Sequence, residues 1–299
     1  MEITLFGQII QYAVTGITIG SIYAMVAIGF NTIYNVTEAI NFAQGEFVML
    51  GGLLMVFFRV GLQIPTVLAI PLTVVVVTVV GMLLNQLAIK PIRQPSVLSI
   101  VIATIGASFF IRGIAMMIWG KTPFDLPPFS GRNPIPFLGA VIQPQGLWVI
   151  GCLVVVVIVL TIFFDRTIMG KALRACAVNP NASSLVGINV RFMVLISFAL
   201  SAAVGALGGI VITPISLMEY DRGAMLAVKG FSACVLGGSG NFPGAVTGGL
   251  LIGLIESFGA GLISSGYKDV FALLVLLAVL FVRPNGLFGN IEISKIKKF

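Results

Sequence analysis

The chain contains no histidine, and only 9% of its 299 residues are charged. The missing imidazole removes the most common general base and metal ligand, which argues against a Ser-His catalytic arrangement and against a metal centre. Cysteine is also scarce, because Cys152, Cys176 and Cys234 are odd in number and unpaired in spacing, so a disulfide framework is not expected. We therefore expect no metal, no cofactor and no enzyme activity in this chain.

Hydrophobic residues are abundant instead, at 58% of the chain, whereas a soluble domain is about one quarter charged. Apolar runs long enough to cross a membrane recur from end to end. The pattern predicts an all-α polytopic integral membrane protein, with residues 1–299 forming one transmembrane domain of about eight spans. The predicted spans are Ile9–Ile33, Phe42–Phe58, Thr66–Leu87, Val97–Trp119, Leu147–Phe164, Phe192–Ile212, Pro243–Leu262 and Val270–Val282.

One further segment is apolar and helical in pattern but too short for an ordinary span. It runs from Gly223 to Leu236 and stops at Gly237-Gly238-Ser239-Gly240. Broken helices survive at membrane depth where protein or a water-filled cavity satisfies their backbone groups, and such segments often line a substrate path. We predict a short broken or re-entrant helix here, either lining a path or simply packing in the interior.

Basic residues set the predicted orientation, because lysine and arginine are enriched in cytosolic loops. Ten of them fall on one side: Lys90, Arg93, Arg166, Lys171, Arg174, Arg191, Arg283, Lys295, Lys297 and Lys298. Five fall on the other: Arg59, Lys121, Arg132, Arg222 and Lys268. We expect a cytosolic C-terminus, an outer N-terminus and a short helix that crosses. The dispersed charges suit a membrane protein and argue against nucleic acid as a partner.

The loop predicted outside the membrane, residues 120–146, holds six prolines and is too proline-rich for a long helix. We expect an ordered cap, which is either a surface for a binding protein or a plain structured loop.

The loop predicted in the cytosol, about residues 165–191, is long, basic and well capped. Asn179 can cap a helix N-terminus, Pro180 suits the first helical position, and Gly187 can adopt the left-handed conformation that ends a helix. This predicts two short helices. A rigid helix below the bilayer could contact a cytosolic partner or rest on anionic lipid through Lys171 and Arg174, and the residues alone leave both open.

With this loop, three other segments resemble the permeases of branched-chain amino acid ABC importers, the LivH type. They are NVTEAINFAQGEFVMLGG at 35–52, VLGGSGNFPGAVTGGLLIGLIES at 235–257 and RPNGLFG at 283–289. The resemblance covers nearly the whole chain in the same order. It implies that the loop couples to ATPases through Arg174, Asn179, Ala182, Gly187, Ile188 and Asn189.

The resemblance also implies an assembly in a prokaryotic inner membrane. Its members are a second permease subunit, two cytosolic ATPase subunits that carry ATP and magnesium, an extracytoplasmic amino-acid-binding protein and the surrounding lipid. The implied substrates are leucine, isoleucine and valine, with urea or another amino acid or amide as alternatives. The chain's own P-loop-like run, 115–122, lacks the first glycine and ends a predicted span, so ATP hydrolysis is expected on another chain.

Charged residues within spans point to a path or to structural pairs, because an isolated charge in a bilayer is costly. Glu46 lies near the predicted cytosolic start of its span, so it could line a path, cap a helix or reach the interface. Lys229 and Glu256 each lie roughly 9 Å inside the outer surface, which predicts that they pair, unless each reaches outward separately. These acids also keep an ion-coupled secondary transporter open as an alternative.

Overall fold

The computed structural model describes residues 5–92, 96–137, 139–283 and 285–289. Within these ranges eight helical segments are long and apolar enough to cross a membrane, which confirms the predicted all-α polytopic fold. The long helices are α1 (Leu5–Thr37), α2 (Gln44–Val56) with a π-helical turn (Phe57–Gly61), α3 (Thr66–Leu84) with a π-helical turn (Asn85–Ile89), α4 (Val97–Trp119), α5 (Pro144–Arg166), α8 (Val190–Ile212), α10 (Phe242–Leu262) and α11 (Lys268–Val282), the last preceded by a 3-10 turn (Ser265–Tyr267).

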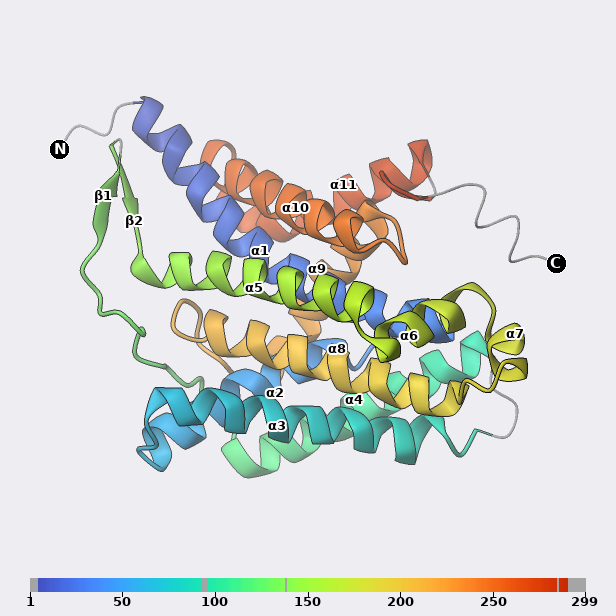
Figure 1. Cartoon of the computed structure of the whole chain (residues 1–299). Helices are drawn as coiled ribbons and strands as arrows, with labels where there is room; N and C mark the ends of the chain where they lie inside the picture. Colours follow the sequence, from blue (N-terminus) through green and yellow to red (C-terminus); the bar gives the residue numbers. More distant parts are fainter. Residues whose placement is uncertain (1–4, 93–95, 138, 284, 290–299) are drawn as a thin grey trace.

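Three shorter helices and one hairpin complete the described chain. They are α6 (Ile168–Val178), α7 (Pro180–Leu185), α9 (Arg222–Gly237), β1 (Ile135–Phe137) and β2 (Ala140–Ile142). The hairpin and the start of α1 lie at one end of the bundle, and α6 and α7 lie at the other (Figure 1). We name these the hairpin end and the α6–α7 end. The described part of the chain begins at the hairpin end, and α11 ends toward the opposite side.

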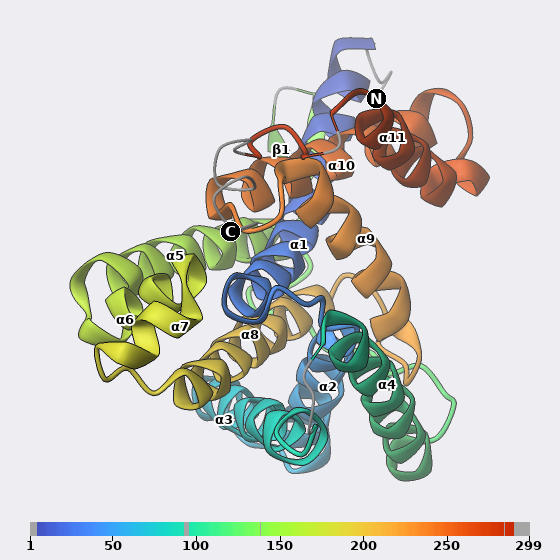
Figure 2. The same cartoon turned by 90° about the vertical axis from the view of Figure 1, so that its right-hand side faces the viewer.

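The core is built around α1, which packs most extensively against α10 and also contacts α8, α9 and α5 (Figure 2). Its central stretch from Ile22 to Ile28 is almost completely buried. Small residues allow this contact, since a Cβ added at Gly20 would lie 2.8 Å from the Gly249 carbonyl oxygen of α10. The outer helices α4 and α11 keep most of their surface exposed, as lipid-facing helices do.

α2 begins inside the bundle, not at its surface. The Gln44 side chain donates to the carbonyl of Ser201, near the middle of α8, at 3.2 Å. The incoming chain is correspondingly buried, and Asn41 and Ala43 have no exposed surface. The helix therefore begins two residues later than the predicted span Phe42–Phe58. It also begins deeper in the protein, because the connection after α1 turns back into the bundle.

α9 matches the predicted broken helix closely and begins beside the start of α2. The backbones of Gly45 and Gly223 come so close that a Cβ on either would clash with the other. At its other end, Gly238 (φ +101°) terminates α9, and Asn31 of α1 satisfies the turn through a bond from the Gly240 N–H at 2.8 Å. Close glycine packing thus holds the first end of the short helix, and the buried Asn31 side chain holds the other.

The final described segment packs against this turn: Leu287 and Phe288 donate backbone hydrogen bonds to the carbonyls of Leu236 and Gly237. The second and third of the segments that carried the family resemblance therefore lie side by side. Arg93, Pro284 and the tail lysines Lys295, Lys297 and Lys298 lie outside the described residues.

The proline-rich loop is ordered, as expected, and the hairpin within it was not foreseen. Besides the hairpin, an antiparallel bridge between Phe124 and Met218 fixes this loop and joins it to the loop before α9. Leu126 is fully buried beneath it. The loop ends at Gln143, because Pro144 already starts α5.

Candidate functional site

The loop between α5 and α8 contains the two short helices that the sequence predicts. Asn179 caps α7, with its Oδ1 accepting from the Ala182 N–H at 3.0 Å, and Pro180 occupies the first position. Gly187 has φ +89°, the left-handed conformation expected of a helix stop. Asn189 then caps α8 through the Phe192 N–H at 3.1 Å. Two caps and a glycine thus fix α7 rigidly to the start of α8.

The tip of α7 is apolar and exposed. Leu185 and Val186 retain 88% and 77% of their accessible surface, whereas Ser183 on the opposite face is buried against the protein. The predicted Ala182 is also exposed, and Ile188 is half-buried against α6 and α8. We name Leu185 and Val186 the α7 knob. Two large apolar side chains at the tip of a rigid helix can be covered by a groove on another protein.

Arg174 lies one helix earlier and points back toward its own chain. Its guanidinium pairs with Asp165 at the end of α5 and lies 5.9 Å from the centre of the Phe164 ring. Both charged groups of the pair are about half exposed. Arg174 therefore holds α6 against α5. The position of α6 relative to α7 depends on this contact.

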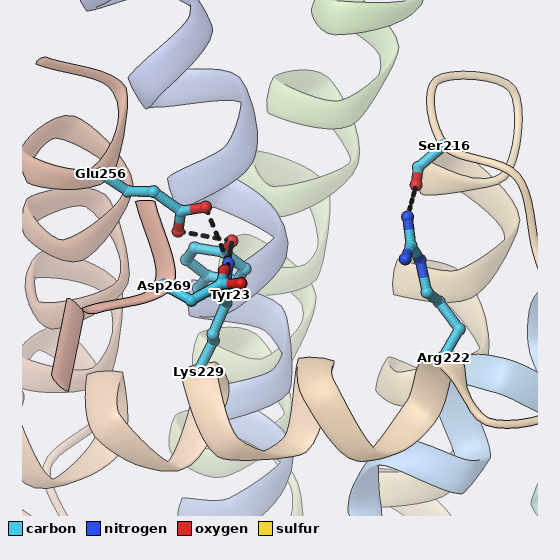
Figure 3. Close-up of polar contacts among 6 residues, drawn as sticks. All are labelled: Tyr23, Ser216, Arg222, Lys229, Glu256 and Asp269. Carbon is cyan, nitrogen blue, oxygen red and sulfur yellow. Dashed lines mark hydrogen bonds and ion pairs between the residues drawn. The ribbon is translucent and has the colours of Figure 1, made fainter. Parts of the chain in front are cut away.

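The predicted pair of Lys229 and Glu256 is present and buried. The Lys229 Nζ lies 2.7 Å from Glu256 Oε1, and their side chains are only 8% and 5% exposed. Two further groups join them (Figure 3): Asp269 Oδ1 lies 2.6 Å from Lys229 Nζ, and the Tyr23 hydroxyl donates to Glu256 Oε2 at 2.8 Å. The alternative in which both charges reach outward separately is wrong, because their charged ends point at each other.

This cluster, which we call the Lys229 cluster, joins four elements at one point. Tyr23 comes from α1, Lys229 from α9, Glu256 from α10 and Asp269 from the start of α11. One ammonium faces two carboxylates, and Asp269 is 41% exposed while the rest is buried. The cluster fixes α9 to the core, with its acidic side toward the surface of the bundle.

A second buried ion pair lies on the other side of α9. Glu46 is 1% exposed, and its Oε1 accepts from Arg112 Nη2 and from the Ser108 hydroxyl of α4, both at 2.8 Å. The Glu46 side chain does not reach an interface, so that expectation is wrong, and no side-chain cap is formed at the start of α2. The reason is the depth of α2, which begins within the bundle and directs Glu46 toward α4.

Arg112 keeps 23% of its side chain exposed although it lies seven residues, roughly 10 Å, from the end of α4. Nearby, at the entrance to α9, Arg222 pairs with Glu219 at 3.8 Å and donates to Ser216 at 2.9 Å (Figure 3). Charged side chains therefore lie along α9 from its first residue, Arg222, to Lys229. Met225 and Val228 on its outer side remain about half exposed.

Sequence reasoning missed several members of these clusters. Arg112 was a visible signal, since an arginine inside an apolar span needs a partner. Tyr23 and Asp269 gave no such signal, because a tyrosine is ordinary in a span and Asp269 lies at a helix start. The α7 knob could have been found from two apolar residues just before a helix-ending glycine.

Among the described residues, no three His, Cys, Asp or Glu side chains gather as a metal site requires. The run at 115–122 lies at the C-terminal end of α4 and not before a helix N-terminus, the position at which a P-loop binds phosphate.

The described residues form eight helices long and apolar enough to cross a membrane, a short helix held by buried ion pairs and a capped helix outside the bundle. This is the architecture expected of a membrane permease. A family model described as "Branched-chain amino acid transport system / permease component" matches residues 12–280. This chain belongs to that family.

Curated relatives agree over nearly the full length. The high-affinity branched-chain amino acid transport system permease protein BraD of Pseudomonas aeruginosa is 31% identical, covering 96% of this chain and 98% of its own. The corresponding protein LivH of Escherichia coli K12 is also 31% identical, covering 97% and 99%. The ribose import permease protein RbsC of Haemophilus influenzae is more distant, at 25% identity over 87% of this chain and 81% of its own.

Proposed function

We propose that this chain is the transmembrane permease subunit of an ABC importer that carries leucine, isoleucine and valine across a prokaryotic inner membrane. The similarity to BraD and LivH supports this substrate class, because it is higher and more complete than the similarity to the ribose permease. Because related permeases are named for different substrates, the assignment follows the relatives of higher identity and coverage.

In this proposal the α6–α7 end faces the cytosol and the hairpin end faces outward. Ten basic residues in the sequence fall on the side of α6 and α7, and five fall on the opposite side. The ordered proline-rich loop then presents the hairpin to an extracytoplasmic binding protein.

The α7 knob is the observation on which the ATPase contact depends. Leu185 and Val186 would enter a groove on a cytosolic ATPase, while Asn179, Gly187 and Asn189 hold α7 in a fixed position relative to α8. Motion of the ATPase would then reach the bundle directly, because α8 packs against α1, α2 and α3. ATP and magnesium belong to the two ATPase subunits.

The second permease would cover the outer side of α9, which lies between α4 and α11 in the bundle (Figure 2). The partly exposed Arg112 supports this assignment, because a charge at membrane depth is costly against lipid and tolerated beside protein or water. Glu46, Lys229 and Glu256 would then flank a path between the two permeases. Since each acid already has a cationic partner, their presence has a structural explanation that does not need a coupling ion.

The test is binding-protein-stimulated ATP hydrolysis by the purified importer across a panel of leucine, isoleucine, valine, urea and ribose. We expect stimulation by the three branched-chain amino acids and none by ribose or urea. Stimulation by urea alone would overturn the substrate class. Failure of the permease to co-purify with any ATPase would overturn the coupling assignment.

A further inference from the structure

A cavity of about 870 Å³ lies at the α6–α7 end, outside both buried ion-pair clusters. Four elements form it: the last residues of α1, the π-helical turn after α3, the start of α4 and the start of α8. It is partly open, and its size suits a small molecule or a lipid headgroup. No residue of the proposed ATPase contact except Asn189 lines it.

The rim of the cavity is cationic. Lys90 and Arg191 both line it; the Lys90 Nζ contacts Gln86 Oε1 at 2.9 Å, and Arg191 forms no ion pair with any residue that the structure describes. The capped starts of α4 and α8 also open here, and helix N-termini attract anions. Glu38 is the one acidic side chain among the described lining residues, so positive groups dominate.

Asn85 provides an independent indication of a ligand. It lies in the π-helical turn, lines the cavity and is only 4% exposed. No side-chain hydrogen bond between the described residues involves Asn85, and its amide is not sealed off by the protein, so it is free to bond to a group in the cavity. A polar ligand in the cavity would supply the missing partner.

Most of the remaining lining is apolar, including Ile89, Ile100 and Leu195, and the site lies where the termini of α1, α3, α4 and α8 meet. A ligand with an anionic head and an apolar body fits this combination. Basic pockets between spanning helices on the cytosolic side bind anionic lipid headgroups, because that leaflet is negatively charged.

We propose that this cavity binds the headgroup of an anionic phospholipid of the cytosolic leaflet. Lys90 and Arg191 contact its phosphate, and Asn85 donates to a headgroup oxygen. The lipid joins the end of α3 and the start of α4 to the start of α8, directly after the α7 stop. The proposal rests on the orientation given under the proposed function, and it does not depend on which substrate is carried.

The test uses the full-length permease, purified alone or with its partners, and native mass spectrometry after exchange into mixtures of phosphatidylglycerol and phosphatidylcholine. We expect one phosphatidylglycerol to be retained in preference to phosphatidylcholine. The double variant Lys90→Gln/Arg191→Gln should bind it about twenty-five-fold more weakly, since each interfacial cation contributes about fivefold. Asn85→Leu should weaken retention while both cations remain.

The matched control is Arg166→Gln/Lys171→Gln, which removes two cations from the same end of the bundle without altering the cavity lining. It should retain the lipid as the wild type does. Unchanged thermal unfolding of every variant in detergent will show that the fold is intact. Equal retention by the Lys90/Arg191 and control variants would overturn the proposal.

A second arm separates the sources of the anion. Glycerol 3-phosphate or leucine at millimolar concentration should not displace the bound phosphatidylglycerol. Displacement by either, lost in the Lys90→Gln/Arg191→Gln variant, would show that the cavity takes a free anion instead and would overturn the lipid assignment. Lipid retention is measured by mass spectrometry and not by transport. A failed transport assay would therefore contradict the proposed function without contradicting the lipid site.

Discussion

Lys229 bonds to two carboxylates, and this predicts unequal effects for substitutions in its cluster. Lys229→Met leaves Glu256 and Asp269 facing each other without a cation, which should cost about 3–5 kcal/mol in the free energy of unfolding. Glu256→Gln should cost less, because Asp269 still pairs with the ammonium. Thermal and denaturant unfolding in detergent would measure both.

The double variant Lys229→Met/Glu256→Gln should recover much of the loss, because it removes one of the two unpaired carboxylates. A coupling free energy near zero in this cycle would contradict the cluster. Asp269→Asn provides an internal reference, and it should have the smallest effect because its side chain is 41% exposed.

A second residue-level prediction concerns Arg112. Arg112→Leu leaves Glu46 buried without its cation and should destabilise the permease by about 3–5 kcal/mol. Ser108→Ala leaves the cation in place and removes the hydroxyl that donates to Glu46, a hydrogen bond worth about 1 kcal/mol. Arg132→Gln is the matched control, since its pair with Asp125 is largely exposed. Equal unfolding midpoints for Arg112→Leu and Arg132→Gln would show that the buried pair does not contribute as described.

The sequence could predict a contact in these clusters only where the depth of both residues follows from the local pattern. The pair of Lys229 and Glu256 was predictable, because the two residues have similar depth in neighbouring elements and opposite charge. The partner of Glu46 was not, because its depth depends on the connection after α1 folding back into the bundle. That turn is held by tertiary contacts, from the Gln44 side chain to the Ser201 carbonyl and from the Phe42 N–H to the Thr104 hydroxyl, which no local pattern specifies.

At the scale of elements, α7 has two parts with separate roles: Asn179 and Gly187 fix its ends, and the α7 knob faces outward. Asn179→Ala should destabilise the helix by about 1 kcal/mol, and Gly187→Pro should distort its stop. Both variants should insert in the membrane normally and bind ATPase subunits more weakly. Co-purification of the ATPases and membrane content of the permease measure the two effects separately.

Leu185→Ser tests the knob directly, because it removes exposed apolar surface without touching a cap. It should reduce ATPase co-purification while the unfolding midpoint of the permease stays unchanged. Ile263→Ser, which replaces a side chain of similar exposure at the hairpin end, should leave co-purification unaltered. If normal co-purification and transport persisted in Leu185→Ser and in the Asn179→Ala/Gly187→Pro double variant, α7 would be better explained as a helix resting on lipid.

The elements themselves were predictable where local chemistry marks their limits. Ser96 and Gly120 bound α4 at the predicted residues, and Asn179 with Gly187 bounded α7. The hairpin at 135–142 was missed because prolines obscure its short strands. The π-helical turns that extend α2 and α3 also escaped prediction, since hydrophobic pattern does not separate them from α-helix.

For the whole molecule, the proposed orientation predicts the labelling of single introduced cysteines. Ala182→Cys should react with an impermeant maleimide only after the cells are opened, and Arg132→Cys should react in intact cells. Labelling of Ala182→Cys from outside intact cells would reverse the orientation and remove the coupling assignment with it.

The native thiols should give little background in this experiment. Cys176 and Cys234 are buried and Cys152 is partly buried. Burial raises the pKa of the Cys176 thiol above its ordinary value, so the reactive thiolate is rarer at neutral pH and increases as pH rises. The parent protein should therefore remain nearly unlabelled at pH 7, as mass spectrometry would show.

The central claim is that ATP hydrolysis on partner subunits drives branched-chain amino acid movement through this permease, by way of α7. The most direct measurement is leucine uptake into proteoliposomes that hold the complete importer and its binding protein. The account predicts uptake that requires ATP, resists a protonophore and falls sharply in Leu185→Ser. Uptake that persists without ATP and collapses with the protonophore would contradict it and favour an ion-coupled transporter.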